Sequence, residues 1–300
     1  MAEVFITSLN SGSNGNCYYI GNENEAVLID AGISCRETEK RMKRLGLSMY
    51  KVKAIFVSHE HTDHIRGIPV LAKKYRLPVY ITSATARNSR ISFDGLHLEE
   101  FSAYEPVTIG NLSVSAFPKL HDAIDPHSFV VNCSGITVGV FTDIGAPCEH
   151  VIQHFQQCHA AILEANYDDD MLENGYYPYH LKKRIRGDRG HLSNHQALAL
   201  FTACKPAFMS HVFLGHLSKD NNCPNLAKNL FTPFAEGTEV VVASRFEETA
   251  VYSICNNGKN ITTTVAKPVP LAEVLSKKSG KRSKNAAKAA ANQLSLFDIL

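Results

Sequence analysis

Short runs of apolar and β-branched residues, separated by Gly, Asn and Ser, fill the first sixty positions, and this pattern predicts strands joined by tight turns. The first expected strands are VFITSL (4–9), CYYI (17–20) and AVLI (26–29), with the loop SGSNGN (11–16) after the first. Ser34 and Glu37 then have the three-residue spacing of a capping box. This spacing predicts a helix over 36–45.

The later apolar runs alternate between strand and helix patterns as far as Cys255. The expected elements are a strand at 53–58, a helix that runs to Arg76, a strand at 78–82, mainly strands from Leu98 to Thr142, helices near 148–158, 194–203 and 224–235, strands at 160–165 and 208–215, and two closing strands before Cys255. Such alternation predicts a mixed α/β protein with two strand-rich stretches.

The pattern changes after Lys267, where the chain becomes rich in Lys, Ala and Ser, as in a solvated linker. The last residues, QLSLFDIL, are apolar again. We therefore expect a folded domain over 1–265, a flexible basic linker over 266–291 and a C-terminal partner-docking peptide over 292–300. A basic linker that ends in an isolated apolar peptide is typical of segments that dock on a partner.

The composition is typical of soluble globular proteins, with 44% hydrophobic and 20% charged residues. No run approaches the roughly 18 consecutive apolar residues of a transmembrane helix, and the start MAEVFITSLN lacks the pattern of a secretory signal. The eight cysteines contain no CxxC pair, which indicates reduced thiols and a cytoplasmic protein. The 14 histidines point instead to metal chemistry based on imidazole and carboxylate groups.

Charge is distributed unevenly along the chain. From Lys267 to Leu300 there are seven Lys or Arg residues against Glu273 and Asp298, a net charge of +5, whereas the whole chain has a net charge of +2. The part before Lys267 is therefore slightly acidic. A basic tail on an acidic body favours an anionic partner, most simply nucleic acid.

The main chemical signal is the run His59-Glu60-His61-Thr62-Asp63-His64, directly after an expected strand. His59 and His61 are two positions apart on a tight loop and can bind one metal ion. Asp63 and His64 are adjacent and can turn toward a second ion nearby. Two divalent ions roughly 3.5–4 Å apart are a common arrangement for hydrolysing phosphate esters. The alternative is a histidine-rich surface loop without a metal.

This run resembles the second motif of the metallo-β-lactamase fold. The resemblance implies an αββα four-layer sandwich, and the family's other motifs occur in its order. LIDAG supplies Asp30, which orients the site in the family; HDAIDP supplies the third histidine, His121; FTDIG supplies the bridging residue, Asp143; and FLGHLS supplies the last histidine, His216.

Two of these assignments have competitors in the sequence. His121 competes with His127, and His216 competes with His211. We favour His121 because His127 is more typical of a structural residue. We favour His216 because it follows its expected strand, where ligands of this family lie, whereas His211 is inside that strand. Asp143 could also simply cap a loop.

Differences from related branches narrow the chemistry that the resemblance implies. Flavodiiron proteins have Glu where this chain has His61, and many true β-lactamases have Cys at the position of Asp143. Glyoxalase II has the same ligand set and is not excluded. Nucleases of this fold, such as ribonuclease Z and ribonuclease J, have a further His in a loop before the last motif. His191 in GHLSN matches it and is our candidate to protonate the leaving oxygen or to contact the phosphate. Alternatively, Ser193 or Asn194 caps a helix and His191 is incidental.

Longer segments resemble the bacterial YycJ/WalJ family within this fold. They are SLNSGSNGNCYYI, LIDAGISC, SHEHTDH, HDAIDP, TDIG, EANYDDDML, GYYPYHLKKRIRGDRGHLSN and GHLSKDNNCPNLA. The resemblance implies a 5′-to-3′ DNA exonuclease with Mn²⁺ or Zn²⁺ in its site. Tyr167 in EANYDDD departs from the family pattern, in which we expect His. We therefore place no metal at Tyr167, because tyrosine does not readily replace an imidazole ligand.

Two further segments are candidates for binding partners. Lys182, Lys183 and Arg184 precede His191 and could neutralise phosphates that lead into the site; the alternative is a solvated basic helix. Near the C-terminus, four side chains resemble the sliding-clamp-binding motif Gln-Leu-x-Leu-Phe of bacteria, with apolar groups that would fill a preformed pocket. These are Gln293, Leu294, Leu296 and Phe297. The alternative is a terminal helix that packs on the body.

Together these features predict a two-metal DNA exonuclease that acts on single strands or ends in repair or replication-linked processing. The expected metal ligands are His59, His61, Asp63, His64, His121, Asp143 and His216, with catalytic roles for Asp63 and His191. One alternative is a small-molecule phosphodiesterase or a thioesterase of the glyoxalase II type, which the basic run disfavours. The other is a non-catalytic clamp-binding adaptor, which the full ligand set disfavours.

Overall fold

A computed structural model describes residues 3–256 of the 300-residue chain. The chain divides into two units, Met1–Ile261 and Thr262–Leu300, and the description concerns the first. The linker and the docking peptide expected at 266–291 and 292–300 lie outside the described residues.

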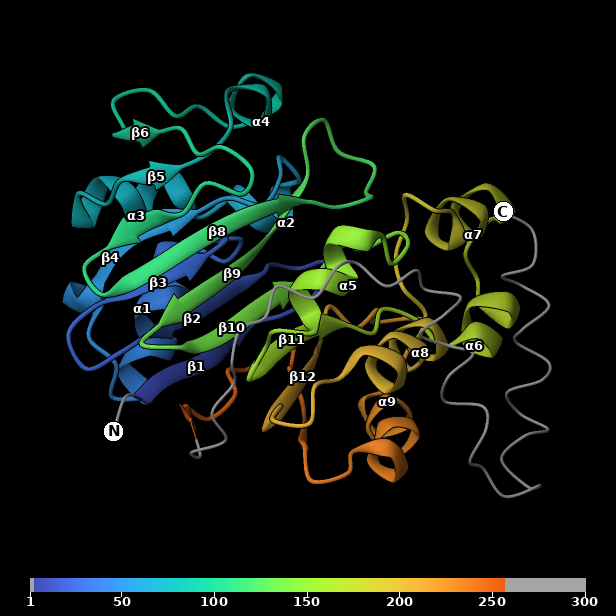
Figure 1. Cartoon of the computed structure of the whole chain (residues 1–300). Coiled ribbons are helices and arrows are strands. Elements are labelled where there is room, and N and C mark those ends of the chain that lie inside the picture. Colours follow the sequence, from blue (N-terminus) through green and yellow to red (C-terminus); the bar gives the residue numbers. More distant parts are fainter. Residues whose placement is uncertain (1–2, 257–300) are drawn as a thin grey trace. The chain divides into compact units, whose positions relative to one another are not determined.

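Helices and strands alternate through this unit, as the apolar pattern predicts (Figure 1). The first half contains β1 (Glu3–Asn10), β2 (Cys17–Gly21), β3 (Ala26–Ile29), α1 (Cys35–Arg44), the 3-10 helix η1 (Met49–Lys51), β4 (Val52–Phe56), α2 (Thr62–Ile65), α3 (Ile68–Tyr75), β5 (Val79–Tyr80), α4 (Ser83–Asn88), β6 (Leu98–Glu99), β7 (Val107–Ile109), β8 (Leu112–Pro118) and β9 (His127–Cys133). The second half contains β10 (Ile136–Phe141), α5 (Glu149–Phe155), β11 (Ala160–Glu164), α6 (Asp169–Asn174), α7 (Tyr179–Arg186), α8 (Asn194–Cys204), β12 (His211–Gly215), α9 (Pro224–Phe231), the 3-10 helix η2 (Thr232–Phe234), β13 (Glu239–Val242) and β14 (Tyr252–Cys255).

The strands form two seven-stranded sheets. The first has the order β14-β1-β2-β3-β4-β5-β6, and the second has the order β13-β12-β11-β10-β9-β8-β7. Both are mixed: in the second sheet β10, β11, β12 and β13 are parallel, whereas β7, β8, β9 and β10 pair antiparallel. The last described strand pairs with the first, with Ile254 opposite Val4.

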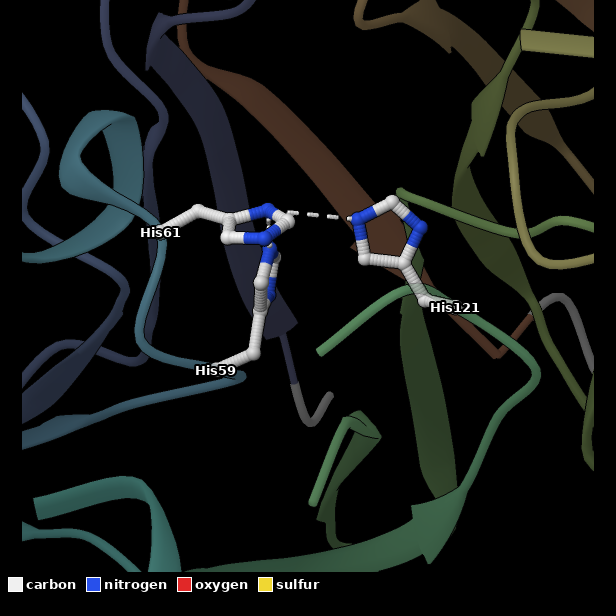
Figure 2. A group of neighbouring side chains, drawn as sticks. All are labelled: His59, His61 and His121. Carbon is white, nitrogen blue, oxygen red and sulfur yellow. Dashed lines mark hydrogen bonds between the residues drawn. The ribbon is translucent and has the colours of Figure 1, made fainter. Parts of the chain in front are cut away.

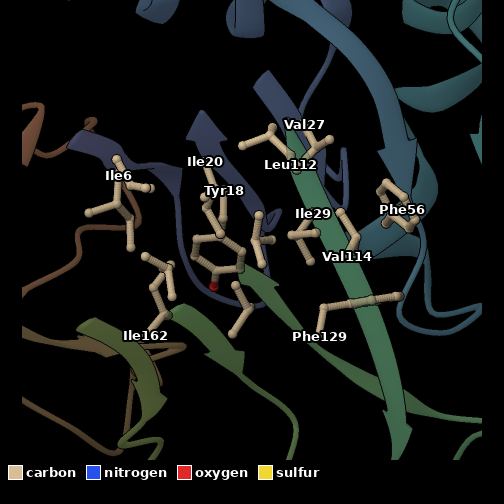
Figure 3. Packing of buried hydrophobic residues seen from close by; sticks show 14 of the residues in the cluster. Ile6, Tyr18, Ile20, Val27, Ile29, Phe56, Leu112, Val114, Phe129 and Ile162 are labelled. Carbon is tan, nitrogen blue, oxygen red and sulfur yellow. The ribbon is translucent and has the colours of Figure 1, made fainter. Parts of the chain in front are cut away.

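The main hydrophobic core lies between the two sheets (Figure 3). Alternation along β3 explains how one strand serves two cores: Val27 and Ile29 point into the layer between the sheets, whereas Ala26 and Leu28 point to the other face. A strand buried on both faces is a continuous apolar run, as AVLI is. Phe56 and Phe129 close the inter-sheet layer with an edge-to-face contact of 5.7 Å between ring centroids.

Helices cover the outer faces of both sheets. Met42 of α1 and Leu71 of α3 pack on the outer face of the first sheet, and α5 and α9 contact strands of the second. The order helix, sheet, sheet, helix confirms the predicted αββα sandwich. None of the helices between residues 3 and 256 is long and apolar enough to cross a membrane.

The structure differs from the expected helix running to Arg76, because that segment forms two helices, α2 and α3, with Gly67 between them. The Gly67 N–H donates to the carbonyl of Ala31 at 2.8 Å. A side chain at Gly67 would collide with the chain, since a Cβ there would lie 1.9 Å from the carbonyl oxygen of Ile33. This close approach ends α2 and directs α3 away from the end of β3.

Candidate metal centre

Three of the expected site residues follow strand ends at the same edge of the sandwich. Asp30 follows β3, Asp143 lies shortly after β10, and His216 follows β12. All three have a positive φ, of 60°, 56° and 55° respectively. Residues other than glycine rarely adopt this conformation, and it is retained mainly where the surrounding structure enforces it, often at functional sites.

The first group consists of three histidines, His59, His61 and His121 (Figure 2). His59 Nε2 lies 3.1 Å from His61 Nδ1, and His121 Nε2 lies 3.4 Å from the same nitrogen. His59 and His121 are buried, whereas the His61 side chain is 31% exposed. Three imidazole nitrogens that face one another are a common set of ligands for a divalent ion.

Hydrogen bonds to the outer nitrogens orient two of these rings. The hydroxyl of Ser58 lies 2.8 Å from His59 Nδ1, and the carbonyl of Gly190 lies 3.0 Å from His121 Nδ1. In each ring the Nδ1 contact leaves Nε2 directed toward the group. Histidine ligands of metals are usually held in this way by a partner at the second nitrogen.

The second group joins the end of the HEHTDH run to β12. Asp63 Oδ2 lies 3.5 Å from His64 Nε2 and 3.5 Å from His216 Nε2. His64 is fully buried, and Asp30 Oδ2 lies 2.7 Å from its Nδ1. Asp30 also accepts hydrogen bonds from the backbone and the hydroxyl of Ser58. Its carboxylate therefore fixes His64 with Nε2 toward the centre.

Asp143 lies between the two groups. One oxygen, Oδ2, is 3.2 Å from His64 Nε2. The other oxygen, Oδ1, is 3.8 Å from His121 Nε2 and 3.5 Å from His216 Nδ1. A carboxylate with one oxygen toward each group has the placement that a bridging ligand requires.

The donor set fits divalent metal ions. Imidazole and carboxylate groups converge here, and Asp143 Oδ2 and His216 Nε2 are buried without a hydrogen bond to any residue from 3 to 256. The approach of Asp143 Oδ2 to His64 and that of His216 Nε2 to Asp63 therefore lack hydrogen-bond geometry. Buried polar atoms without partners are costly, and an ion that they ligate satisfies them. His127 and His211 contact other residues, the Asp125 carbonyl and Glu239, and lie outside these groups.

The structure adds one residue that the sequence analysis missed, Glu164, the last residue of β11. Its Oε1 lies 2.8 Å from His191 Nδ1 and 3.0 Å from His216 Nδ1, and its Oε2 accepts from the backbone N–H of Ile144. The signal was a single acidic residue at the end of an otherwise apolar strand. In the EANYDDD segment, Glu164 and Asn166 contact His216, and Tyr167 is not among the residues grouped as possible metal ligands.

His191 lies at the edge of the centre. Its side chain is 22% exposed, and its Nδ1 lies 3.8 Å from Asp143 Oδ1. The Glu164 contact at Nδ1 leaves Nε2 without a hydrogen bond to the described part of the chain. Ser193 also caps α8, with its side chain accepting from the backbone of Gln196. The cap of α8 by Ser193 and the contact between His191 and Glu164 therefore occur together and are not alternatives.

The chain was compared with known families and proteins. Residues 25–216 match the model of the beta-lactamase superfamily domain. An exodeoxyribonuclease YycJ of Bacillus anthracis is 34% identical over 247 residues, which cover 81% of this chain and 94% of that protein. An exodeoxyribonuclease WalJ of Streptococcus pneumoniae is 31% identical, with 73% and 83% of the two chains covered.

The chain belongs to the YycJ/WalJ family of the metallo-β-lactamase superfamily. The predicted fold and family are thus confirmed, and the protein is a metal-dependent hydrolase. The solved structure of YhfI from Bacillus subtilis, a metallo-beta-lactamase fold protein, has a TM-score of 0.65 to this chain at 18% identity. It covers 84% of this chain and 99% of its own length, which supports the fold alone.

Electrostatics in the centre of this YycJ/WalJ protein favour metal-binding forms. Burial lowers the pKa of His121 to about 3 and that of His59 well below its ordinary value, so both rings are neutral. Burial also opposes protonation of His64, but the surrounding carboxylates, Asp143 first, raise its pKa to about 10. The same carboxylates that raise this pKa would also attract a cation, and His64 would bind an ion in its neutral form, because metal-binding imidazoles are deprotonated.

The basic residues predicted to bind nucleic acid lie on α7, just before the loop of His191. Arg184 pairs with Asp122, the residue after His121, and is 61% exposed. Lys182 donates to the carbonyl of Glu173. Lys183 is exposed and makes no ion pair or hydrogen bond within residues 3–256. The helix is therefore near the centre, but two of its three candidate cations already have partners in the protein.

The four side chains predicted to bind the clamp, Gln293, Leu294, Leu296 and Phe297, lie outside the described residues. Their role stays a prediction.

Replacing Gly32 with alanine should damage the metal-binding loop. A Cβ at Gly32 would lie 1.6 Å from the carbonyl oxygen of Asp63, and Asn16 hydrogen-bonds both residues, so neither segment can move aside freely. We expect a loss of about 2–4 kcal/mol in the free energy of unfolding and less bound metal. Thermal unfolding and elemental analysis measure the two effects.

Gly187→Ala is the matched control, since the atom nearest to a Cβ there, the carbonyl oxygen of Lys183, would be 3.4 Å away. It should behave like the wild type. A Gly32→Ala protein with unchanged unfolding and metal content would show that this contact does not hold the loop.

Proposed function

We propose that this protein is a 5′-to-3′ DNA exonuclease that uses two divalent ions, Zn²⁺ or Mn²⁺, and acts on single strands or ends. The observation that carries the proposal is the Glu164–His191 pair beside the two groups of ligands. A histidine held by a carboxylate beside groups of imidazole and carboxylate ligands supports proton transfer at a metal centre. The YycJ and WalJ relatives, which are exodeoxyribonucleases by name, support DNA as the substrate.

In this proposal, His59, His61 and His121 hold one ion, and Asp63, His64 and His216 hold the other. Asp143, whose oxygens lie near His64, His121 and His216, would help to hold both. When bound, such ions supply a water-derived nucleophile at neutral pH and stabilise negative charge on the phosphate. Asp63 is partly exposed and accepts a hydrogen bond from the Asn16 side chain at 3.2 Å, so it can also orient a water molecule.

His191 has the proton-transfer role. Burial alone would raise the pKa of Glu164, but His191 and His216 lower it to about 2, so it is a carboxylate at neutral pH. The carboxylate accepts from His191 Nδ1, which fixes the orientation of the ring. His191 Nε2 is then the atom that can give a proton to the leaving oxygen of the scissile phosphate.

A panel of end-labelled substrates tests the proposed activity. Single-stranded DNA, duplex DNA and RNA, labelled at either end, are incubated with the protein and Mn²⁺, Mg²⁺ or Zn²⁺. We expect release of labelled mononucleotides from 5′-labelled DNA from the start of the reaction. The 3′ label should stay on progressively shorter fragments.

The other outcomes of this panel are equally specific. Degradation of RNA but not DNA would change the substrate, and early loss of the 3′ label would reverse the polarity. Hydrolysis of a small phosphodiester or thioester with intact nucleic acids would instead favour the small-molecule hydrolase. No hydrolysis of any substrate by metal-loaded protein would favour the adaptor.

We also propose a role in DNA repair or replication-linked processing, with the 292–300 segment docking on the sliding clamp through Gln293, Leu294, Leu296 and Phe297. A tether of basic residues over 266–291 would raise the concentration of the nuclease at DNA ends. The sequence motif and its position after a basic segment support this partner.

A further inference from the structure

The loop over residues 11–16 connects the metal centre to two arginines that are remote from each other in the sequence. On its inner side, Ser11 Oγ accepts from the backbone N–H of His216 at 2.7 Å, and Asn16 Nδ2 lies 3.0 Å from His64 Nε2. The loop is therefore fixed against the residues that hold the centre. Residues that are hydrogen-bonded to the outer side of the loop are therefore also fixed relative to the centre.

Asn14, near the outer end of this loop, contacts both arginines. Arg66, which follows α2 and lies three positions after Asp63, donates from Nη2 to the Asn14 carbonyl at 2.8 Å. The Asn14 side chain in turn donates to the carbonyl of Arg245 at 2.8 Å. Two guanidinium-bearing residues are thus anchored to one asparagine beside the centre.

Neither of these arginines is neutralised by a carboxylate of the described chain. Arg245 Nη1 is buried and has no hydrogen-bond partner within residues 3–256. Carboxylate partners engage the other arginines of this region and of α7, which are Arg41, Arg44, Arg184 and Arg186. The Arg245 side chain as a whole is only partly buried, so its guanidinium group can also face an anion that accepts from it.

An aromatic ring stands next to Arg245. Phe246 is 74% exposed, and the guanidinium carbon of Arg245 lies 6.0 Å from its ring centroid. The backbone of Phe246 is nevertheless held in place, because its carbonyl accepts from Arg41 Nη2 at 2.9 Å. Arg41 itself is buried and also donates to the carbonyl of Leu9. A rigid backbone that presents an exposed ring is suited to stacking on a base.

We propose that Arg66, Arg245 and Phe246 form a subsite for single-stranded DNA, in which the two arginines bind backbone phosphates and Phe246 stacks on a base. The inference rests on the proposed nuclease function and assigns the strand to the side of the 11–16 loop. A cation pair with an adjacent exposed aromatic ring is the usual composition of a surface that binds single strands without reading sequence. On α7, by contrast, Arg184 is already paired with the carboxylate of Asp122.

Salt dependence of binding tests the two arginines. A fluorescent single-stranded oligonucleotide is titrated with the full-length protein in EDTA, so that no cleavage occurs, over a series of salt concentrations. Each lost phosphate contact should lower the slope of log affinity against log salt by about 0.7 for a single strand. The Arg66→Ala, Arg245→Ala double variant should therefore lose about 1.4 from the slope.

Three control proteins make this result specific. Arg87→Ala removes an exposed charge from α4, which lies beside β6 in Figure 1, and should keep the wild-type slope. The Arg66→Lys, Arg245→Lys double variant keeps both charges and should keep most of the wild-type salt slope. The Arg66→Gln, Arg245→Gln double variant removes both charges but retains polar side chains. Its salt slope must fall as in the alanine double variant, even if the alanine double variant is less stable.

Phe246→Ala tests the stacking surface. Affinity for an ordinary oligonucleotide should fall about 10-fold. For an oligonucleotide without bases at the contacted positions, wild type and variant should bind with the same affinity, because Phe246 then has no base on which to stack. Equal losses on both oligonucleotides would overturn the stacking role.

The outcomes separate this subsite from the function on which it rests. A wild-type protein that degrades DNA, together with a glutamine pair whose salt slope is unchanged, overturns the subsite and leaves the nuclease intact. A wild-type protein that neither binds nor degrades DNA overturns both. A reduced slope in both pairs that lose charge, with the lysine pair near wild type, supports the subsite.

Discussion

Asp143→Asn should lower DNA hydrolysis by at least about 10³-fold, equivalent to roughly 4 kcal/mol of transition-state stabilisation, and should reduce bound metal. Asp143 is buried, and its oxygens face His64 on one side and His121 on the other. Asparagine has the same shape but no charge. The variant therefore loses the negative charge that would balance the two ions.

Asparagine also suits this backbone better than alanine does. Asp143 has a φ of 56°, a conformation that asparagine tolerates well among non-glycine residues. The fold should therefore persist, and a loss of activity reports on the centre. Elemental analysis of the purified variant and its rate on labelled DNA measure the two effects.

Asp94→Asn is the matched control for this substitution, since Asp94 is exposed and forms no ion pair with other described residues. It should retain wild-type metal content and rate. An Asp143→Asn protein that keeps full metal content and full activity would remove Asp143 from the centre.

His191→Ala should lower the rate by about 10²–10⁴-fold, the usual contribution of one acid–base group, without loss of metal. The ring is partly exposed, so its removal leaves no large core cavity. Its Nδ1 contacts Glu164, and its Nε2 is the nitrogen left for the substrate. The rate on labelled DNA and the metal content are measured together.

Two further variants complete this test: one is a control, and the other forms a double-mutant cycle with His191→Ala. His195→Ala removes a more exposed histidine of α8, which pairs with Asp169 of α6, and should keep the wild-type rate. Glu164→Gln should slow the wild-type protein but have much less effect in the His191→Ala background, because residues that act together are not additive. A His191→Ala protein that loses metal would instead be missing a ligand or a structural residue.

Much of the centre could be predicted from the sequence because its residues follow strand ends or form the compact HEHTDH run. Asp30, Asp143 and His216 each follow an apolar run, and parallel or neighbouring strands bring such ends to one edge. The choice of His121 over His127 depended on family resemblance. The structure brings His121, and not His127, next to His61.

Other features depend on contacts between distant segments and gave no local signal. Glu164 ends an ordinary apolar strand, and its partners His191 and His216 follow much later in the chain. The break between α2 and α3 comes from the approach of Gly67 to the end of β3. Arg245 is linked to the centre through the 11–16 loop, which contacts both Arg245 and His216.

The same limit applies to the basic helix. From the sequence, Lys182, Lys183 and Arg184 form a uniform run of positive charge. Folding brings Asp122 to Arg184 and the Glu173 carbonyl to Lys182, so the charges differ in how available they are. Sequence patterns locate charges, but only the tertiary structure shows which of them are already paired.

Metal-dependent DNA hydrolysis at this centre is tested most directly by titrating metal-free protein with Mn²⁺ or Zn²⁺. The measured quantity is the rate of nucleotide release from single-stranded DNA. A two-metal nuclease should release no nucleotides before the ion is added, and its rate should rise with the amount of bound metal. The rate of the Asp143→Asn variant should hardly rise when the ion is added. Release that persists in excess chelator and is equal in Asp143→Asn would contradict metal-dependent hydrolysis at this centre.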